Sequence, residues 1–179
     1  IGLNVTHVVL DSELTISDPE SITIYCGIDA LSHGLEGCLA DTKTSEEDIH
    51  KSHECVRLVF RNLPCLISTP DNIDARQSMC LAAYYGGNAI NKQLAGYIHA
   101  FAHSIGALYH IPHGKAIALC IIPIVSFHKN ICMDKLAKLS IHCGFSKETD
   151  DEAVAADRFI AALEELLKTC GFERGCDLI

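Results

Sequence analysis

Only one segment of this 179-residue chain has the pattern of a β-strand. Val5–Leu10 (VTHVVL) is rich in β-branched residues, whereas the sequence that follows is dominated by helical spacing and helix caps. A single strand cannot form a sheet, so this segment either pairs with residues outside the sequence or is an extended tail. The sequence therefore predicts an all-α helical bundle over residues 19–179, preceded by a leader over residues 1–18.

Helix-start signals, apolar spacing and proline or glycine breaks divide this bundle into helices. Asp18 before Pro19 predicts the first start, and Ser45 with the acidic residues after it predicts the second. We expect the first long helix to be interrupted at Cys26–Gly27 and the second to end near Pro64. The expected helical segments are Ser21–Ala40, Ser45–Pro64, Asp71–Ile90, Gly96–Tyr109, His113–Phe127, Ile131–Cys143 and Thr149–Cys170.

Composition and charge exclude several classes of protein. Apolar residues make up 49% of the chain and charged residues 21%, which is enough for a sizeable core. The net charge is −9, and no run of lysines or arginines offers a surface for nucleic-acid phosphate. The longest apolar stretch, around Ala116–Val125, is far shorter than the ~20 residues of a membrane-spanning helix. We therefore expect neither a nucleic-acid nor a membrane partner.

The chain contains 10 cysteines, and no two of them have the spacing C-x-x-C. That spacing is typical of zinc ribbons and thioredoxin-like redox motifs, so neither is supported. The chain is also long and apolar enough to fold without a disulfide scaffold. The cysteines therefore indicate buried thiols in a reducing compartment, and we expect a cytoplasmic protein.

Carboxylate and imidazole side chains are paired at helical spacing in two places. Asp29 and His33 are four residues apart, as are His99 and His103, so each pair can converge on one point. His113 follows a proline turn that can bring it back toward the helix of His99. Burying these groups without partners would cost several kcal/mol, which a shared cation would compensate. The spacing predicts a metal site and leaves His99 and His103 as equally good ligands.

Two stretches around these residues resemble signatures of the iron-containing (group III) alcohol dehydrogenase family. Gly27–Glu36 (GIDALSHGLE) is similar to that family's first metal-binding stretch, and His99–Gly114 (HAFAHSIGALYHIPHG) is similar to its second. The resemblance runs from about Val8 to Phe127. It implies the helical metal-binding domain of a dehydroquinate synthase-like enzyme, with Val5–Leu10 as the last strand of a preceding α/β domain.

The resemblance also implies a ligand set, with Asp29, His33, His99 and His113 holding one divalent metal. This makes His99 a ligand and leaves His103 beside the site, facing the nicotinamide and the substrate oxygen. His103 is therefore the predicted catalytic and cofactor-contacting residue, because an imidazole can relay a proton. The implied cofactors are Fe2+ or Zn2+ and NAD(P), since one carboxylate with imidazoles suits either metal. The implied activity is hydride transfer between NAD(P) and a small alcohol or aldehyde.

Proteins of this family hold the dinucleotide in an N-terminal domain with a glycine-rich phosphate loop, and no G-x-G-x-x-G occurs here. We therefore expect a fragment that also stops before the final helices of the family and is inactive alone. Its open apolar surface predicts self-association, as a dimer. The sequence does not distinguish NAD from NADP or identify the alcohol.

Other functions remain open at this point. A glycerol dehydrogenase-like or maleylacetate reductase-like enzyme would have the same fold. A non-catalytic helical metal-binding module is a further alternative, because Glu47-x-x-His50, with His53 and Glu54 nearby, is similar to one half of a di-iron motif. The second Glu-x-x-His that such a motif needs does not occur in the sequence.

Overall fold

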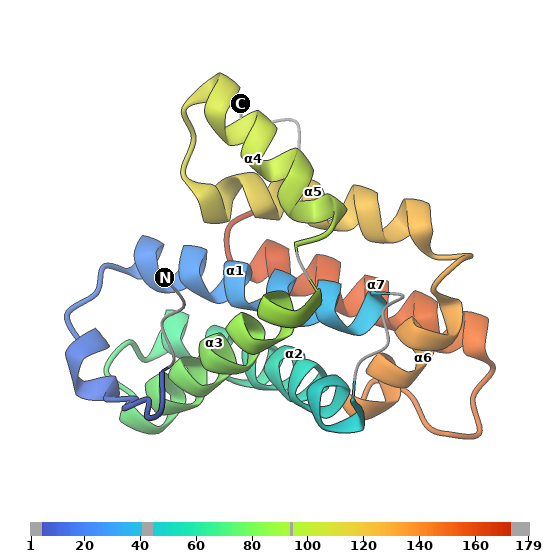
Figure 1. Cartoon of the computed structure of the whole chain (residues 1–179), viewed down its shortest axis with the longest axis horizontal. Helices are drawn as coiled ribbons and strands as arrows, with labels where there is room; N and C mark the ends of the chain where they lie inside the picture. The colour runs from blue at the N-terminus through green and yellow to red at the C-terminus, as the bar shows by residue number, and fades with distance from the viewer. Residues whose placement is uncertain (1–4, 41–44, 94, 173–179) are drawn as a thin grey trace.

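The predicted all-α fold is confirmed by a computed structural model, which describes residues 5–40, 45–93 and 95–172 (Figure 1). Residues 1–4 of the predicted leader, residues 173–179 with Cys176, residues 41–44 and residue 94 lie outside this description. The described residues form a short 3-10 helix and seven α-helices. These are η1 (Ser12–Thr15), α1 (Glu20–Leu39), α2 (Glu46–Ser68), α3 (Ile73–Gln93), α4 (Tyr97–Tyr109), α5 (His113–His128), α6 (Met133–His142) and α7 (Glu152–Thr169).

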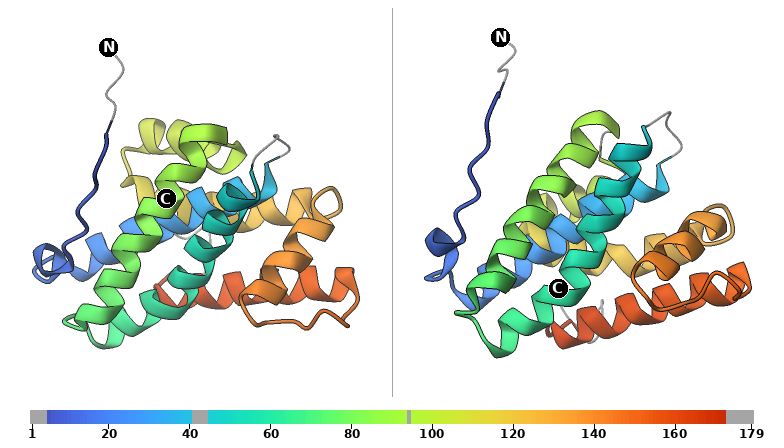
Figure 2. Two further views of the ribbon diagram at one scale, coloured as in Figure 1. Left: turned by 60° about the horizontal axis from the view of Figure 1, so that its bottom comes forward. Right: turned by 90° about the horizontal axis from the view of Figure 1, so that it is seen from below.

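The expected strand at Val5–Leu10 does not form within the part of the chain that the structure describes. These residues form no ladder with any other described segment, and a strand is stable only when a neighbour accepts its hydrogen bonds. The segment instead extends away from the helices (Figure 2), and Val9 is 87% exposed. Its attachment to the bundle includes a hydrogen bond from the Gln77 side chain to the Leu10 carbonyl. Pairing of this segment with residues outside the sequence stays a prediction.

Two predicted helix breaks are absent because packing outweighs local preference. α1 runs unbroken through Cys26–Gly27, and a Cβ at Gly27 would lie only 2.7 Å from Leu63 Cδ1 of α2. Glycine at this position therefore allows α2 to approach α1 closely. α2 likewise continues past Pro64, although proline lacks the N–H of one helical hydrogen bond.

The helix starts agree only in part with the predicted caps. Ser45 caps α2 as predicted, since its hydroxyl accepts a hydrogen bond from the Asp48 N–H. α1, however, begins at Glu20, and Asp18 makes no capping hydrogen bond to it. α7 begins later than predicted, because Asp151 caps it by accepting hydrogen bonds from the N–H groups of Ala153 and Val154.

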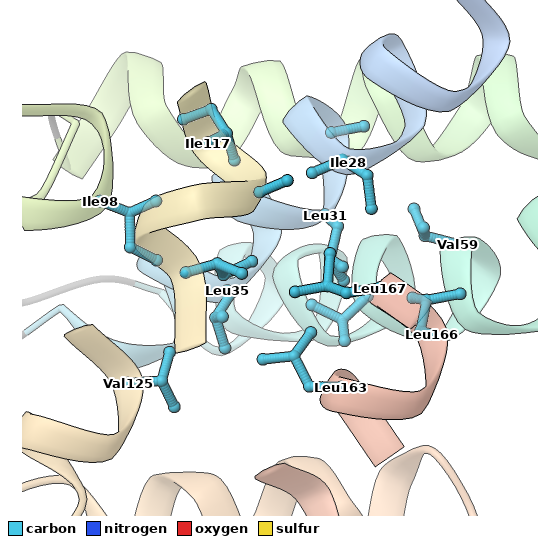
Figure 3. Packing of buried hydrophobic residues seen from close by; sticks show 14 of the residues in the cluster. Ile28, Leu31, Leu35, Val59, Ile98, Ile117, Val125, Leu163, Leu166 and Leu167 are labelled. Carbon is cyan, nitrogen blue, oxygen red and sulfur yellow. The ribbon is translucent and has the colours of Figure 1, made fainter. Parts of the chain in front are cut away.

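α1 is the central helix of the molecule. It lies between the pair α2 and α3 on one side and the pair α4 and α5 on the other (Figure 1). Its residues Ile28, Leu31 and Leu35 are completely buried, and Figure 3 shows them facing side chains from α2, α5 and α7. A fully buried leucine or isoleucine contributes about 2 kcal/mol, so this core fixes α1 firmly. The face of α1 toward α4 and α5 is consequently a rigid support.

The remaining features concern membranes and thiols. Within the described ranges, no helix combines the length and the apolar character needed to cross a membrane. Every cysteine that the structure describes is a free thiol, and several of them are buried.

Candidate metal centre

Three helices bring the four predicted ligands to one place. Asp29 and His33 lie one turn apart on α1, His99 lies in the first turn of α4, and His113 is the first residue of α5. α5 can approach α1 because its second residue is Gly114, where a Cβ would lie 2.5 Å from the Tyr25 backbone oxygen. The close contact between α1 and α5 therefore sets the distance between His113 and Asp29.

One carboxylate oxygen is shared by the three imidazoles. Asp29 Oδ1 lies 3.1 Å from His113 Nε2, 3.3 Å from His99 Nε2 and 3.6 Å from His33 Nε2. Asp29, His99 and His113 each offer a ligand atom within 4.8 Å of the other two, and His33 stacks on His99 with ring centroids 4.5 Å apart. The predicted residues are therefore all neighbours, with the ring of His33 slightly farther from the common point.

The donor set fits a divalent cation. His99 is 3% exposed, and its Nε2 has no hydrogen-bond partner among the described residues, although Asp29 Oδ1 is close by. A buried polar atom without a partner is costly, and a cation between this nitrogen and the carboxylate would remove that cost. One carboxylate with imidazole nitrogens is a ligand set that iron and zinc both accept. The side chain of His113 is 41% exposed, so the cluster opens to solvent on that side.

Charge within the cluster also favours a cation. Burial alone would raise the pKa of the Asp29 carboxyl, but the neighbouring imidazoles, His99 above all, outweigh this and hold its pKa below the ordinary value. Burial would similarly lower the pKa of His99, yet Asp29 and Glu36 raise it to about 9. Asp29 is therefore ionised at neutral pH, and its negative charge is directed at the rings.

Glu36 is a buried residue of this site that sequence reasoning missed. It lies on α1 three residues after His33, on the same face, and its Oε2 is 2.7 Å from His99 Nδ1. Burial would raise its pKa, but the His99 ring and backbone N–H groups together lower it. The signal that could have found it is an acidic residue seven positions after Asp29, at the end of the stretch Gly27–Glu36.

His103 lies beside the cluster, and its catalytic role stays a prediction. It follows His99 by one turn on α4, is exposed, and its ring centroid is 5.1 Å from that of His113 and 5.9 Å from that of His99. Like His33, it is outside the group of described ligand atoms that converge within 4.8 Å, but unlike His33 it makes no ion-pair contact with Asp29 Oδ1. Its position at the open side suits contact with a bound molecule better than metal ligation.

A second group of histidines lies where α2 meets α6. His142 is 2.7 Å from Glu54, and its ring centroid is 5.2 Å from that of His53 and 6.0 Å from that of His50. Glu54 also binds Arg57 with both oxygens. Ligand atoms from these residues do not converge as those around Asp29 do, so this group resembles an ion-pair network more than a metal site.

Comparison with known proteins places this geometry in context. The sequence model of the Fe-containing alcohol dehydrogenase family, C-terminal, matches residues 23–176. The chain belongs to this family. Its relatives include the 1-propanol dehydrogenase PduQ of Salmonella typhimurium, which is 30% identical over 164 residues, covering 90% of this chain and 44% of that protein. The NAD-dependent methanol dehydrogenase of Bacillus methanolicus is 29% identical over 95% of this chain and 44% of its own length.

Solved structures of the family agree with this assignment. A 1,3-propanediol oxidoreductase is 30% identical and superimposes with a TM-score of 0.88, over 94% of this chain and 44% of that one. The family prediction is therefore confirmed, and the match extends farther toward the C-terminal end than the motifs suggested. The chain spans less than half the length of these relatives. The division into a leader and a helical domain stays a prediction.

Proposed function

We propose that this chain provides the metal-binding domain of an NAD(P)-linked alcohol dehydrogenase or aldehyde reductase. The observation that carries the proposal is the meeting of three imidazole Nε2 atoms, from His33, His99 and His113, around Asp29 Oδ1 within 3.6 Å. Membership of the iron-containing alcohol dehydrogenase family supports the oxidoreductase class.

In this proposal Asp29, His33, His99 and His113 hold a single Fe2+ or Zn2+ ion. Such an ion would supply Lewis-acid chemistry to the oxygen of an alcohol or aldehyde. Asp29 contributes the only negative charge among the ligands, so part of the ion's charge stays available for the substrate. His33 stacks against His99 and restricts the rotation of that ring. The exposed side of His113 gives the substrate its approach.

His103 is proposed to handle the proton of the reacting oxygen. It lies at the open side of the cluster and makes ring contacts with His99 and His113, while its own ring is accessible to solvent. An imidazole there could pass a proton between the substrate oxygen and water as hydride moves to or from the nicotinamide. The same position supports its predicted contact with the cofactor.

The substrate and the dinucleotide are proposed only as classes. The names of the relatives, among them dehydrogenases of 1-propanol, methanol and 1,3-propanediol, support a small alcohol or the corresponding aldehyde. One relative is named as NAD-dependent and another as NADPH-dependent, so either dinucleotide is compatible. The homo-oligomer expected from the sequence stays a prediction, which the exposed Tyr97 and Phe127 of α4 and α5 support.

The proposal is tested with the natural protein that contains this chain. We expect reduction of propanal with NADH or NADPH that stops when a chelator removes the metal and returns when Fe2+ or Zn2+ is added. His99→Ala should abolish both the reaction and the binding of the metal. A protein that binds the metal but shows no dehydrogenase activity with any small aldehyde would contradict the proposed enzyme and favour a non-catalytic metal-binding module.

A further inference from the structure

Glu36 connects two helices that each carry part of the candidate metal centre. It lies on α1, is 8% exposed, and its carboxylate faces the first turn of α4. Oε1 accepts hydrogen bonds from the N–H of Ile98 at 2.7 Å and of His99 at 3.3 Å. Oε2 accepts from the N–H of Gly96 at 2.8 Å and lies 2.7 Å from His99 Nδ1. Each carboxylate oxygen therefore has two partners at the start of α4.

The backbone contacts fix where α4 begins. The first N–H groups of a helix have no partners inside the helix, and Gly96 has no side chain that could cap them. The Glu36 carboxylate takes that role from another helix, where its negative charge also suits the positive end of α4. The contact is close, since a Cβ at Gly96 would lie 2.9 Å from Oε1. The start of α4 is thus held against α1.

The ring contact fixes which nitrogen of His99 carries hydrogen. An ionised carboxylate can only accept a hydrogen bond, so the Nδ1 beside Oε2 must be the N–H of the ring. When a cation takes the place of the second ring proton, the lone pair is on Nε2, which is the buried atom without a hydrogen-bond partner that faces Asp29. This is the form of imidazole that can ligate a cation through Nε2.

We propose that Glu36 is a positioning residue of the metal centre, because one carboxylate both anchors α4 to α1 and holds His99 in the orientation and tautomer that present Nε2 to the ion. The inference rests on the proposed metal site and adds the residue that prepares it. Glu36 itself does not touch the ion in this account.

The first test uses Glu36→Gln, which preserves the shape of the side chain. Its amide oxygen can still accept the Ile98 N–H, but the NH2 group would then face His99 Nδ1 and favour the opposite tautomer. We expect the affinity for Zn2+, measured by competition with a chromophoric chelator, to fall by about 10- to 100-fold. Asp151→Ala is the matched control, because it removes the cap of α7 without touching the site. It should lower the melting temperature and leave the affinity unchanged.

The second measurement uses the wild-type chain, so its result does not depend on whether a variant folds. Long-range 1H–15N spectra of the Zn2+-loaded wild-type chain should show that His99 is protonated at Nδ1 and bound through Nε2. Binding through Nδ1 would overturn the inference. Equal Zn2+ affinity of the folded Glu36→Gln and wild-type chains would also overturn it, although the metal site would stand. A wild-type chain that binds no Zn2+ would instead contradict the proposed function.

Discussion

Gly114→Ala tests whether the contact between α1 and α5 sets the geometry of the metal centre. A Cβ at position 114 would lie 2.5 Å from both the Cβ and the backbone oxygen of Tyr25. Carbon atoms pack at about 3.5–4.0 Å, so the two helices would have to separate by roughly 1 Å. The obstacle includes the backbone of a buried helix, and a side-chain rotation cannot remove it.

Separating α1 from α5 would move two of the predicted metal ligands apart. His113 precedes Gly114 on α5, and Asp29 follows Tyr25 by one turn on α1, so the present 3.1 Å between His113 Nε2 and Asp29 Oδ1 would grow. An increase of roughly 1 Å displaces one of four ligands, and we expect the affinity for Zn2+ to fall by about 10- to 100-fold, as when the support of a ligand is lost. Overpacking of this kind should also lower the free energy of unfolding by about 1–3 kcal/mol.

Two measurements on the same preparations check this prediction. Chelator competition gives the Zn2+ affinity, and urea unfolding of the metal-free chain gives the stability. Gly87→Ala in α3 is the matched control, because a Cβ there would meet nothing within 4 Å. It should leave the affinity unchanged and add up to about 1 kcal/mol of stability. If Gly114→Ala kept both the affinity and the stability of the wild type, the close contact would not determine the site.

Three further predictions concern the proton path and acid stability. His103→Ala should reduce turnover and leave the metal content unchanged; loss of the metal would make His103 a ligand. The Arg57 guanidinium lowers the pKa of the Glu54 carboxyl from 4.5 to about 2. Partial burial would raise this pKa, and a hydrogen bond with His142 lowers it further. The wild type should therefore lose stability as pH falls from 4.5 toward 2, and Glu54→Gln should lose less over that range in urea unfolding. Burial and His142 lower the pKa of His53 to about 4 from 6.5, so stability should also decline as pH falls from 6.5 to 4. His53→Gln should flatten that decline, and an unchanged slope would contradict the assigned shift.

The fold could be predicted where local signals act alone. The cap at Ser45 and the apolar periodicity correctly indicated helices, because these effects depend on neighbouring residues. The predicted breaks at Gly27 and Pro64 failed, since their cost is offset by packing between α1 and α2 that local sequence does not reveal. The strand at Val5–Leu10 stays a prediction, because a strand needs a partner and no described residue provides one.

The candidate site could be predicted as a set of residues but not as an arrangement. The spacing of Asp29 and His33 and the family resemblance selected the neighbours that the structure brings together. Glu36 escaped notice, because its role depends on the start of α4 lying against α1. Sequence spacing carries no information on contacts between helices that are 60 residues apart.

The central claim is that one cation is shared by side chains from three helices, and metal analysis of the chain purified without oxygen tests it most directly. We expect one divalent ion per wild-type chain, retained in His7→Ala, which changes an exposed histidine of the leader, and absent from Asp29→Ala and His99→Ala. A wild-type chain without metal, or an ion that remains bound in both Asp29→Ala and His99→Ala, would contradict the account.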